Sequence, residues 1–292
     1  MWTATLGSLF PEYCGFVTTT LHGAAPCHNT VMLRRYLWPA VLQSSIGHNG
    51  AATAPGVNEH LSKQFDAELE SIRSRVLEMG GLVESQIRRA LEGFNSGDRA
   101  TLDDVIATDH RVNAMEVAID GDCSQVIVKR QPAANDLRLI LAIIKTVTDL
   151  ERIGDEAQKI ARMAKNIHER GGVLAPPVVE VRHAAERAIS MLRRTLDAFA
   201  RLDCNAAAEV IRADAGIDAE FGSILRQLIT YMMEDPRTIS TALDIVWVAK
   251  AIERIGDHAK NMAEYVIYIV KGTDVRHTRA AEVERQVSGG GA

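Results

Sequence analysis

Two identical five-residue segments contain the side chains best suited to binding a ligand in this chain. Residues 151–155 and 253–257 both read ERIGD, and each copy lies in an apolar run with helical spacing. The two acids of each copy are four positions apart, so a helix places both carboxylates on one face. Like charges at this spacing cost a few tenths of a kcal/mol, and a glycine inside a helix costs about 1 kcal/mol relative to alanine. A bound cation, together with a partner helix packed closely over the glycine, would account for both features.

A second pair of segments adds further oxygen ligands upstream of each ERIGD. Asp109 and Asn113 in the first half align with Asp214 and Asp218 in the second half. Each pair consists of an acid, an apolar residue at the third position after it and an oxygen-bearing residue at the fourth. The candidate metal ligands are therefore Asp109, Asn113, Glu151, Asp155, Asp214, Asp218, Glu253 and Asp257.

The first half continues its acidic stripe with Glu116 and Asp120, whereas the second half has Phe221 and Leu225 at these positions. Clustered carboxylates without cysteine favour hard cations such as Mg, Ca, Mn or iron, and zinc is also compatible. The alternative is that these acids form ordinary solvated faces.

A catalytic function is not indicated by any motif. The di-iron enzymes of the ferritin type use Glu-x-x-His on two helices, and neither repeat has that spacing. The sequence also contains no HExxH motif, nucleotide-binding glycine loop or nucleophile elbow. We therefore predict that the protein is not an enzyme, and keep a carboxylate-bridged metal-storage or metalloenzyme bundle as the alternative.

Apolar residues at intervals of three and four predict six helices that carry these acids. The expected ranges are 61–94, 99–129, 133–170, 179–201, 206–233 and 238–271. Gln131-Pro132 and Asp235-Pro236 interrupt the pattern at equivalent places, because proline ends one helix and suits the first turn of the next. No β pattern is present. The fold class is therefore all-α, with two homologous three-helix bundles in tandem.

These patterns predict the following domain boundaries. The first bundle covers 57–172 and the second covers 178–275, with glycines and prolines in the linker between them. We hypothesise that this linker is a hinge about which the bundles rotate. Residues 1–56 lack periodicity and are expected to be a disordered extension or a mis-assigned start, with translation beginning at Val57. Residues 276–292 turn polar and are expected to form a flexible tail.

The overall composition is that of an ordinary globular protein. Hydrophobic residues make up 47% and charged residues 24% of the chain. The net charge of −5 argues against nucleic-acid binding. The four cysteines have no framework spacing, which fits a reducing cytoplasm. No uncharged apolar run reaches the ~20 residues that a membrane span needs. A cytoplasmic location is therefore expected.

Several longer segments resemble the PhoU family of bacterial phosphate-signalling regulators. They are FDAELESIRSRVLEMGGLVE, KRQPAANDLRLILAI, DLERIGD, RQLITYMMEDPRTI, AIERIGDHAKNMAEY and YIVKGTDVRH, and the resemblance extends over residues 58–277. It implies two three-helix bundles, frequent homodimers, and metal clusters of iron or other cations (Mg, Mn or Zn). The ligands it implies are Asp109 with Glu151 and Asp155, and Asp214 and Asp218 with Glu253 and Asp257. Asn113 departs from the acidic pattern.

The resemblance also implies a function. PhoU proteins are negative regulators of the phosphate-starvation response and maintain phosphate homeostasis. The resemblance implies that the chain connects the ATPase subunit of the phosphate ABC transporter to a phosphate sensor histidine kinase. A protein of this kind reaches the membrane only through its partners and acts as an adaptor without catalysis.

Overall fold

The computed structural model describes residues 57–171 and 178–288. The expectations for residues 1–56, and for the linker residues 172–177, lie outside this described part of the chain. The last four residues of the expected tail, 289–292, lie outside it as well.

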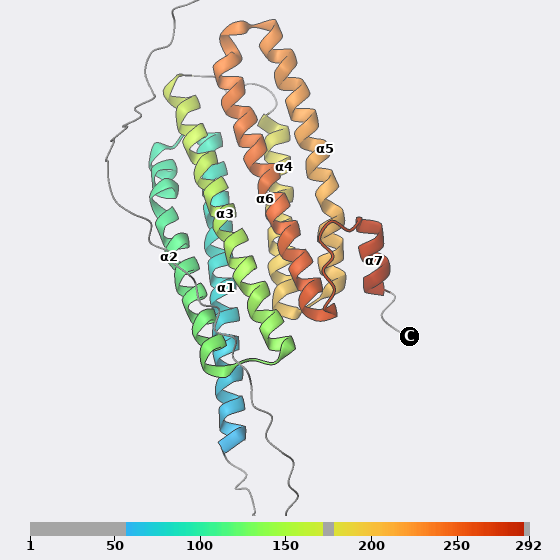
Figure 1. The fold of residues 1–292 in the computed structure, drawn as a ribbon. Coiled ribbons are helices and arrows are strands. Elements are labelled where there is room, and N and C mark those ends of the chain that lie inside the picture. Colours follow the sequence, from blue (N-terminus) through green and yellow to red (C-terminus); the bar gives the residue numbers. More distant parts are fainter. Residues whose placement is uncertain (1–56, 172–177, 289–292) are drawn as a thin grey trace, which may run out of the picture. The chain divides into compact units, whose positions relative to one another are not determined.

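Seven α-helices and one short 3-10 helix make up the described chain (Figure 1). Their bounds are α1 Val57–Ser96, α2 Arg99–Arg130, α3 Ala134–Glu169, α4 Val178–Arg201, α5 Cys204–Glu234, η1 Pro236–Thr238, α6 Ile239–Lys271 and α7 Ala280–Ser288. Helices α1, α2 and α3 pack together, as do α4, α5 and α6, and the described residues contain no strand. The prediction of an all-α fold with two three-helix bundles is confirmed.

Side-chain caps and left-handed residues fix the helix boundaries. Asp98 accepts a hydrogen bond from the Ala100 N–H at the start of α2, and Asp203 accepts from the Asn205 and Ala206 N–H groups at the start of α5. Both acids are typical N-caps that satisfy otherwise free N–H groups. Gly97, with φ +72°, supplies the left-handed residue that ends α1.

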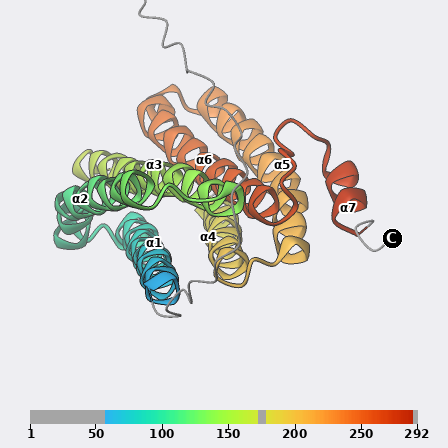
Figure 2. The same ribbon diagram turned by 60° about the horizontal axis from the view of Figure 1, so that its bottom comes forward.

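The two ERIGD-bearing helices, α3 and α6, form the centre of the molecule. They lie side by side between the other helices and contain the longest sets of buried residues (Figure 2). They run antiparallel, because the N-terminal part of α3 meets the C-terminal part of α6 and the reverse. Arg138 lies 5.7 Å from the Tyr268 ring centroid, whereas Arg170 pairs with Asp244 at 2.7 Å.

Buried ionisable groups also pair across the contact between α3 and α6. His258 Nδ1 lies 2.7 Å from Asp149 Oδ1, and both side chains are largely buried. Arg254 pairs with the buried Glu156 at 2.9 Å. Removing one partner of a buried pair leaves an uncompensated charge, which is strongly destabilising. Rotation of the bundles about the linker, as hypothesised from the sequence, would expose and separate these groups.

The prediction of a flexible tail beginning at residue 276 is wrong for the part of it that the structure describes. Residues Ala280–Ser288 form α7, which packs against α5 (Figure 1). Val275, Val283 and Val287 are buried, and Arg212 forms an ion pair with Glu284. The polar composition of this segment obscures a short apolar stripe at four-residue spacing, which is buried only because α5 lies beside it.

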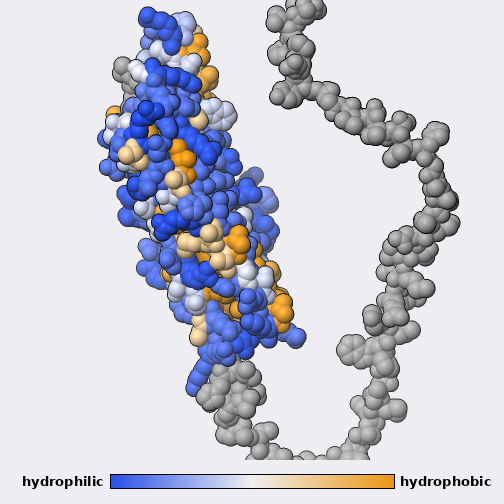
Figure 3. All heavy atoms as spheres, turned by 90° about the vertical axis from the view of Figure 1, so that its left-hand side faces the viewer, coloured by the Kyte–Doolittle hydropathy of each residue, from blue (hydrophilic) through white to orange (hydrophobic). Residues whose placement is uncertain are grey.

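The surface shown in Figure 3 is mainly hydrophilic, with separate apolar patches. This view is taken from the side on which α2 lies in Figure 1. None of the described helices combines the length and apolar character that a transmembrane span requires.

Two adjacent glycines in α1 differ in how closely they approach α4 of the second bundle. A Cβ atom on Gly80 would lie 2.6 Å from Leu196 Cδ2 of α4, whereas one on Gly81 would meet nothing within 4 Å. Alanine at either position gains about 1 kcal/mol of helix propensity. Only Gly80→Ala also forces Leu196 to move, at a cost of about 1–3 kcal/mol.

We therefore expect Gly81→Ala to raise the free energy of unfolding above that of the wild type. The free energy of unfolding of Gly80→Ala should be lower than that of Gly81→Ala by about 1–3 kcal/mol. Denaturant unfolding of the two variants measures this difference. Equal stabilisation by both substitutions would show that α1 and α4 are not in close contact at this point.

Candidate metal centre

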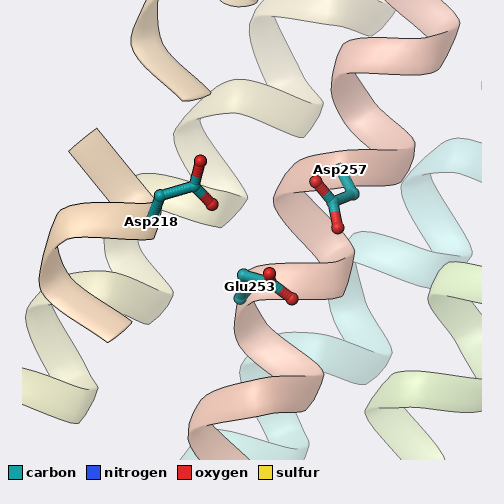
Figure 4. A group of neighbouring side chains, drawn as sticks. All are labelled: Asp218, Glu253 and Asp257. Atoms are coloured by element: carbon teal, nitrogen blue, oxygen red, sulfur yellow. The ribbon is translucent and has the colours of Figure 1, made fainter. Parts of the chain in front are cut away.

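Three carboxylates converge between α5 and α6 in the second bundle. Asp218 projects from α5 toward α6, and Glu253 and Asp257 lie one helical turn apart on α6 (Figure 4). One ligand oxygen from each of the three lies within 4.8 Å of the others. Three oxygen donors at this separation can contact a single ion of ordinary size.

The glycine of each ERIGD segment brings the two helices of its cluster together. A Cβ atom on Gly256 would lie 2.8 Å from Ile217 Cδ1, and one on Gly154 would lie 3.3 Å from Val112 Cγ1. Ile217 and Val112 are the apolar residues three positions after the first acid of the two aligned segments. The closeness expected from the sequence is present in both halves, and it places the acids of α2 and α5 opposite those of α3 and α6.

The electrostatic environment of the second cluster disfavours three ionised carboxylates in the absence of a cation. Burial raises the pKa of Asp257, and the charges of Glu253 and Asp214 raise it further. Burial and the neighbouring Asp214 likewise raise the pKa of Asp218. Lys250 pairs with Glu253 at 2.6 Å and compensates part of this charge. A divalent cation would compensate the remainder.

Asp214, the remaining predicted ligand of this half, is engaged elsewhere. Its Oδ2 accepts a hydrogen bond from Lys260 Nζ at 2.6 Å. Asp214 is buried and still close enough to raise the pKa of Asp257, but it does not belong to the group of three oxygens. Lys260 lies on α6 one turn after Gly256 and has no counterpart in the first half, where Gln158 is the aligned residue.

The first cluster is more extended and less compact. Asp109 is only 7% exposed, and its Oδ1 has no hydrogen-bond partner among the described residues. Burial raises the pKa of Asp109, and the Asp155 charge raises it further. Burial also raises the pKa of Glu151, with Asp155 and Glu116 as the next causes. These acids therefore face one another, although only the second cluster brings three donors within 4.8 Å in the described part of the chain.

Asn113 reduces the negative charge of the first cluster, as its alignment with Asp218 in the repeat predicts. Its side chain is neutral and interacts with Asp109 so as to lower the pKa of that acid. Glu116 and Asp120, which the predicted ligand set leaves out, belong to the same acidic surface, because burial and mutual repulsion raise the pKa of Glu116. The sequence indicates these two residues, because the acidic stripe of α2 continues through them at helical spacing.

Both clusters have the donor chemistry of a site for a hard cation. All the ligand atoms are oxygens, several are partly buried, and Asp109 Oδ1 is a buried acceptor without a partner in the described chain. Mg, Mn, Ca and iron prefer such ligands, whereas sites for softer metals contain sulfur. The residues present therefore fit a bound cation, and the second cluster has the more compact geometry.

Comparisons with known proteins agree with the duplicated architecture. The PhoU domain matches residues 76–164 and again residues 181–266, so each half contains one copy with one ERIGD segment. The phosphate-specific transport system accessory protein PhoU homolog of Pseudomonas putida is 49% identical over 234 residues, covering 80% of this chain and 91% of that protein. The chain belongs to the PhoU family. The resemblance noted in the sequence is confirmed.

Solved PhoU structures share the fold. The crystal structure of PhoU from Pseudomonas aeruginosa matches with a TM-score of 0.70 at 49% identity, covering 72% of this chain and all (100%) of that chain. The structure of the phosphate transport system regulatory protein PhoU from Streptococcus pneumoniae matches with a TM-score of 0.67 at 27% identity, covering 72% of this chain and 99% of that chain. Helix α7 lies beyond the second PhoU domain match, which ends at residue 266.

Metal titration separates the two clusters. We expect Mn²⁺ to bind the second cluster, and Asp257→Asn to weaken this binding by more than about tenfold, since loss of groups that only support the ligands already costs about 10–100-fold. Calorimetry on the purified protein measures the affinity. Glu78→Gln, which removes an exposed acid of α1, is the control and should leave it unchanged. Equal affinity in Asp257→Asn and wild type would exclude the second cluster as the binding site.

The raised pKa values predict how stability depends on pH without metal. A carboxyl whose folded pKa lies above its unfolded value contributes stability that is present at low pH and lost as the pH rises through the folded pKa. We therefore expect Asp257→Asn to stabilise the metal-free protein by about 0.5 kcal/mol at neutral pH, because the amide avoids both the burial of a charge and the repulsion from neighbouring acids. The gain should shrink on acidification.

Thermal unfolding in a chelator over a pH series measures this gain. Saturating Mn²⁺ should reverse the order, because only the wild type then has its full set of ligands. A gain that does not change with pH would contradict the ionised Asp257 carboxylate as its cause.

Proposed function

We propose that this protein is a negative regulator of the phosphate-starvation response that maintains phosphate homeostasis. The observation that carries the proposal is membership of the PhoU family over both halves of the chain. Its relatives are named as a phosphate-specific transport system accessory protein and a phosphate transport system regulatory protein. Those names describe regulation and association with transport, and none describes a catalytic activity.

The proposed partners are the ATPase subunit of the phosphate ABC transporter and the phosphate sensor histidine kinase. In this proposal the protein acts in the cytoplasm, as a homodimer, and reaches the membrane only through these partners. The long exposed faces of α2 and α5 offer helical surfaces of the kind on which other proteins dock.

The proposed role of the acidic clusters is to hold cations that support the regulator. Asp218, Glu253 and Asp257 would hold one ion, which would neutralise the repulsion between them. This ion would tie α5 to α6. The alternative, a metal-storage or metalloenzyme bundle, uses the same ligands, but the names of the relatives do not favour it.

A reporter of the phosphate-starvation response tests the proposal in a strain that lacks its own copy of the regulator. We expect the full chain to repress the reporter at high phosphate. The triple variant Asp218→Asn, Glu253→Gln, Asp257→Asn should lose bound metal and derepress the reporter. A charge-matched control, Glu78→Gln, Glu92→Gln, Asp197→Asn, removes three exposed acids and should repress normally.

The possible results separate the roles of the protein and of the metal. Failure of the wild type to repress the reporter, when the wild type and the triple variant are present at equal levels, would overturn the regulator function. Repression by a metal-free triple variant would instead show that the clusters do not serve regulation.

A further inference from the structure

A cavity of about 350 Å³ lies between α6 and the segment that connects it to α7. It is separate from the group of three carboxylates described above. Its lining consists of Lys260, Asn261 and Glu264 from α6 and Arg276, His277, Thr278 and Arg279 from the connecting segment. The volume is sufficient for a small anion or a compact phosphate ester.

Positive and hydrogen-bond-donating groups dominate this lining. Lys260, Arg276 and Arg279 carry positive charge, and the His277 imidazole adds a further hydrogen-bonding group. Arg276 is held by Asp274, and Lys260 by Asp214. The guanidinium of Arg279 is exposed and forms no ion pair with any residue that the structure describes. Thr278 and Asn261 add neutral donors.

The start of α7 adds oriented backbone donors beside these side chains. The Arg279 carbonyl accepts the N–H groups of Glu282 and Val283, at 2.8 and 3.1 Å, so α7 begins directly at the cavity. The first N–H groups of a helix have no acceptor within it, and the helix dipole favours an anion there.

Local contacts constrain the backbone of the connecting segment. Gly272 ends α6 with φ +74°, and His277 adopts φ +67°, which is unusual for a residue with a side chain. Asp274 accepts hydrogen bonds from the backbone N–H and the guanidinium of Arg276. Val275 is 1% exposed. These contacts constrain the backbone from which Arg276 and Arg279 project, which reduces the reorganisation that ligand binding requires.

Glu264 gives the cavity a further property. Its side chain is 7% exposed and lines the cavity. Burial raises its pKa to about 7. A carboxylate beside an anion site accepts a hydrogen bond from a protonated oxyanion and repels one without a proton. Phosphate keeps a proton near neutral pH, whereas sulfate has none.

We propose that this cavity binds a phosphate group, as inorganic phosphate or a phosphate monoester. Arg279, Lys260, Thr278 and the N-terminus of α7 bind its oxygens, and Glu264 accepts a hydrogen bond from the P–OH group. Its significance for phosphate regulation rests on the proposed function. Phosphate binding is measured on the purified protein, and the regulatory function is measured with the reporter in cells. A failure of the binding proposal is therefore distinguishable from a failure of the proposed function.

Calorimetry on the full-length, metal-free protein in mildly alkaline buffer tests the proposal. We expect inorganic phosphate to bind and sulfate to bind at least about tenfold more weakly. Arg279→Gln should weaken phosphate binding by about tenfold, because it removes a charge-assisted bond. Arg285→Gln, which removes an exposed arginine of α7, is the matched control. Thermal unfolding confirms that each variant is folded.

The remaining arms identify the ligand and the role of Glu264. Glycerol phosphate binding more tightly than inorganic phosphate would support a monoester, and the opposite order would support the free ion. Glu264→Gln should reduce the preference for phosphate over sulfate, since an amide can donate to either anion. No phosphate binding at millimolar concentrations, or equal binding by Arg279→Gln and wild type, would overturn the proposal.

Discussion

The close approach of helices at Gly154 and Gly256 is the constraint on which the acidic clusters depend. At each glycine an apolar side chain of the neighbouring helix occupies the space that a Cβ atom would fill. This contact fixes the distance between α2 and α3 in one half and between α5 and α6 in the other. Carboxylates that would otherwise separate are held together by the packing of the apolar residues around them.

This arrangement sets packing against charge. Burial and mutual repulsion raise the pKa values of Asp109, Glu151 and Asp257, so the folded chain without a cation holds its acids in an unfavourable state. Apolar burial stabilises a fold by about 25 cal/mol per Å². The free energy gained by burying the apolar residues of α3 and α6 is therefore larger than the cost of repulsion between a few carboxylates. Paired lysines reduce the repulsion in the second half, through Lys250 and Lys260.

Sequence periodicity was sufficient to predict the six long helices, the duplication and the acids that face one another. These features depend on local spacing, which a helix converts directly into a shared face. The ion pair between Asp214 and Lys260 depends on side-chain conformation, which residue spacing does not reveal. Helix α7 was missed because its short apolar stripe is stable only against α5. The pair Asp149 and His258 was missed because its partners lie in different halves.

The antiparallel pairing of α3 with α6 has a consequence for the origin of the chain. Equivalent helices of two homologous units meet each other through the same face, which is the form of a twofold-symmetric homodimer interface. A single unit produced on its own would expose this apolar face and could bury it against a second copy. The present protein thus has the arrangement expected of a fused dimer, and its two halves differ in charge at aligned positions such as Asn113 and Asp218.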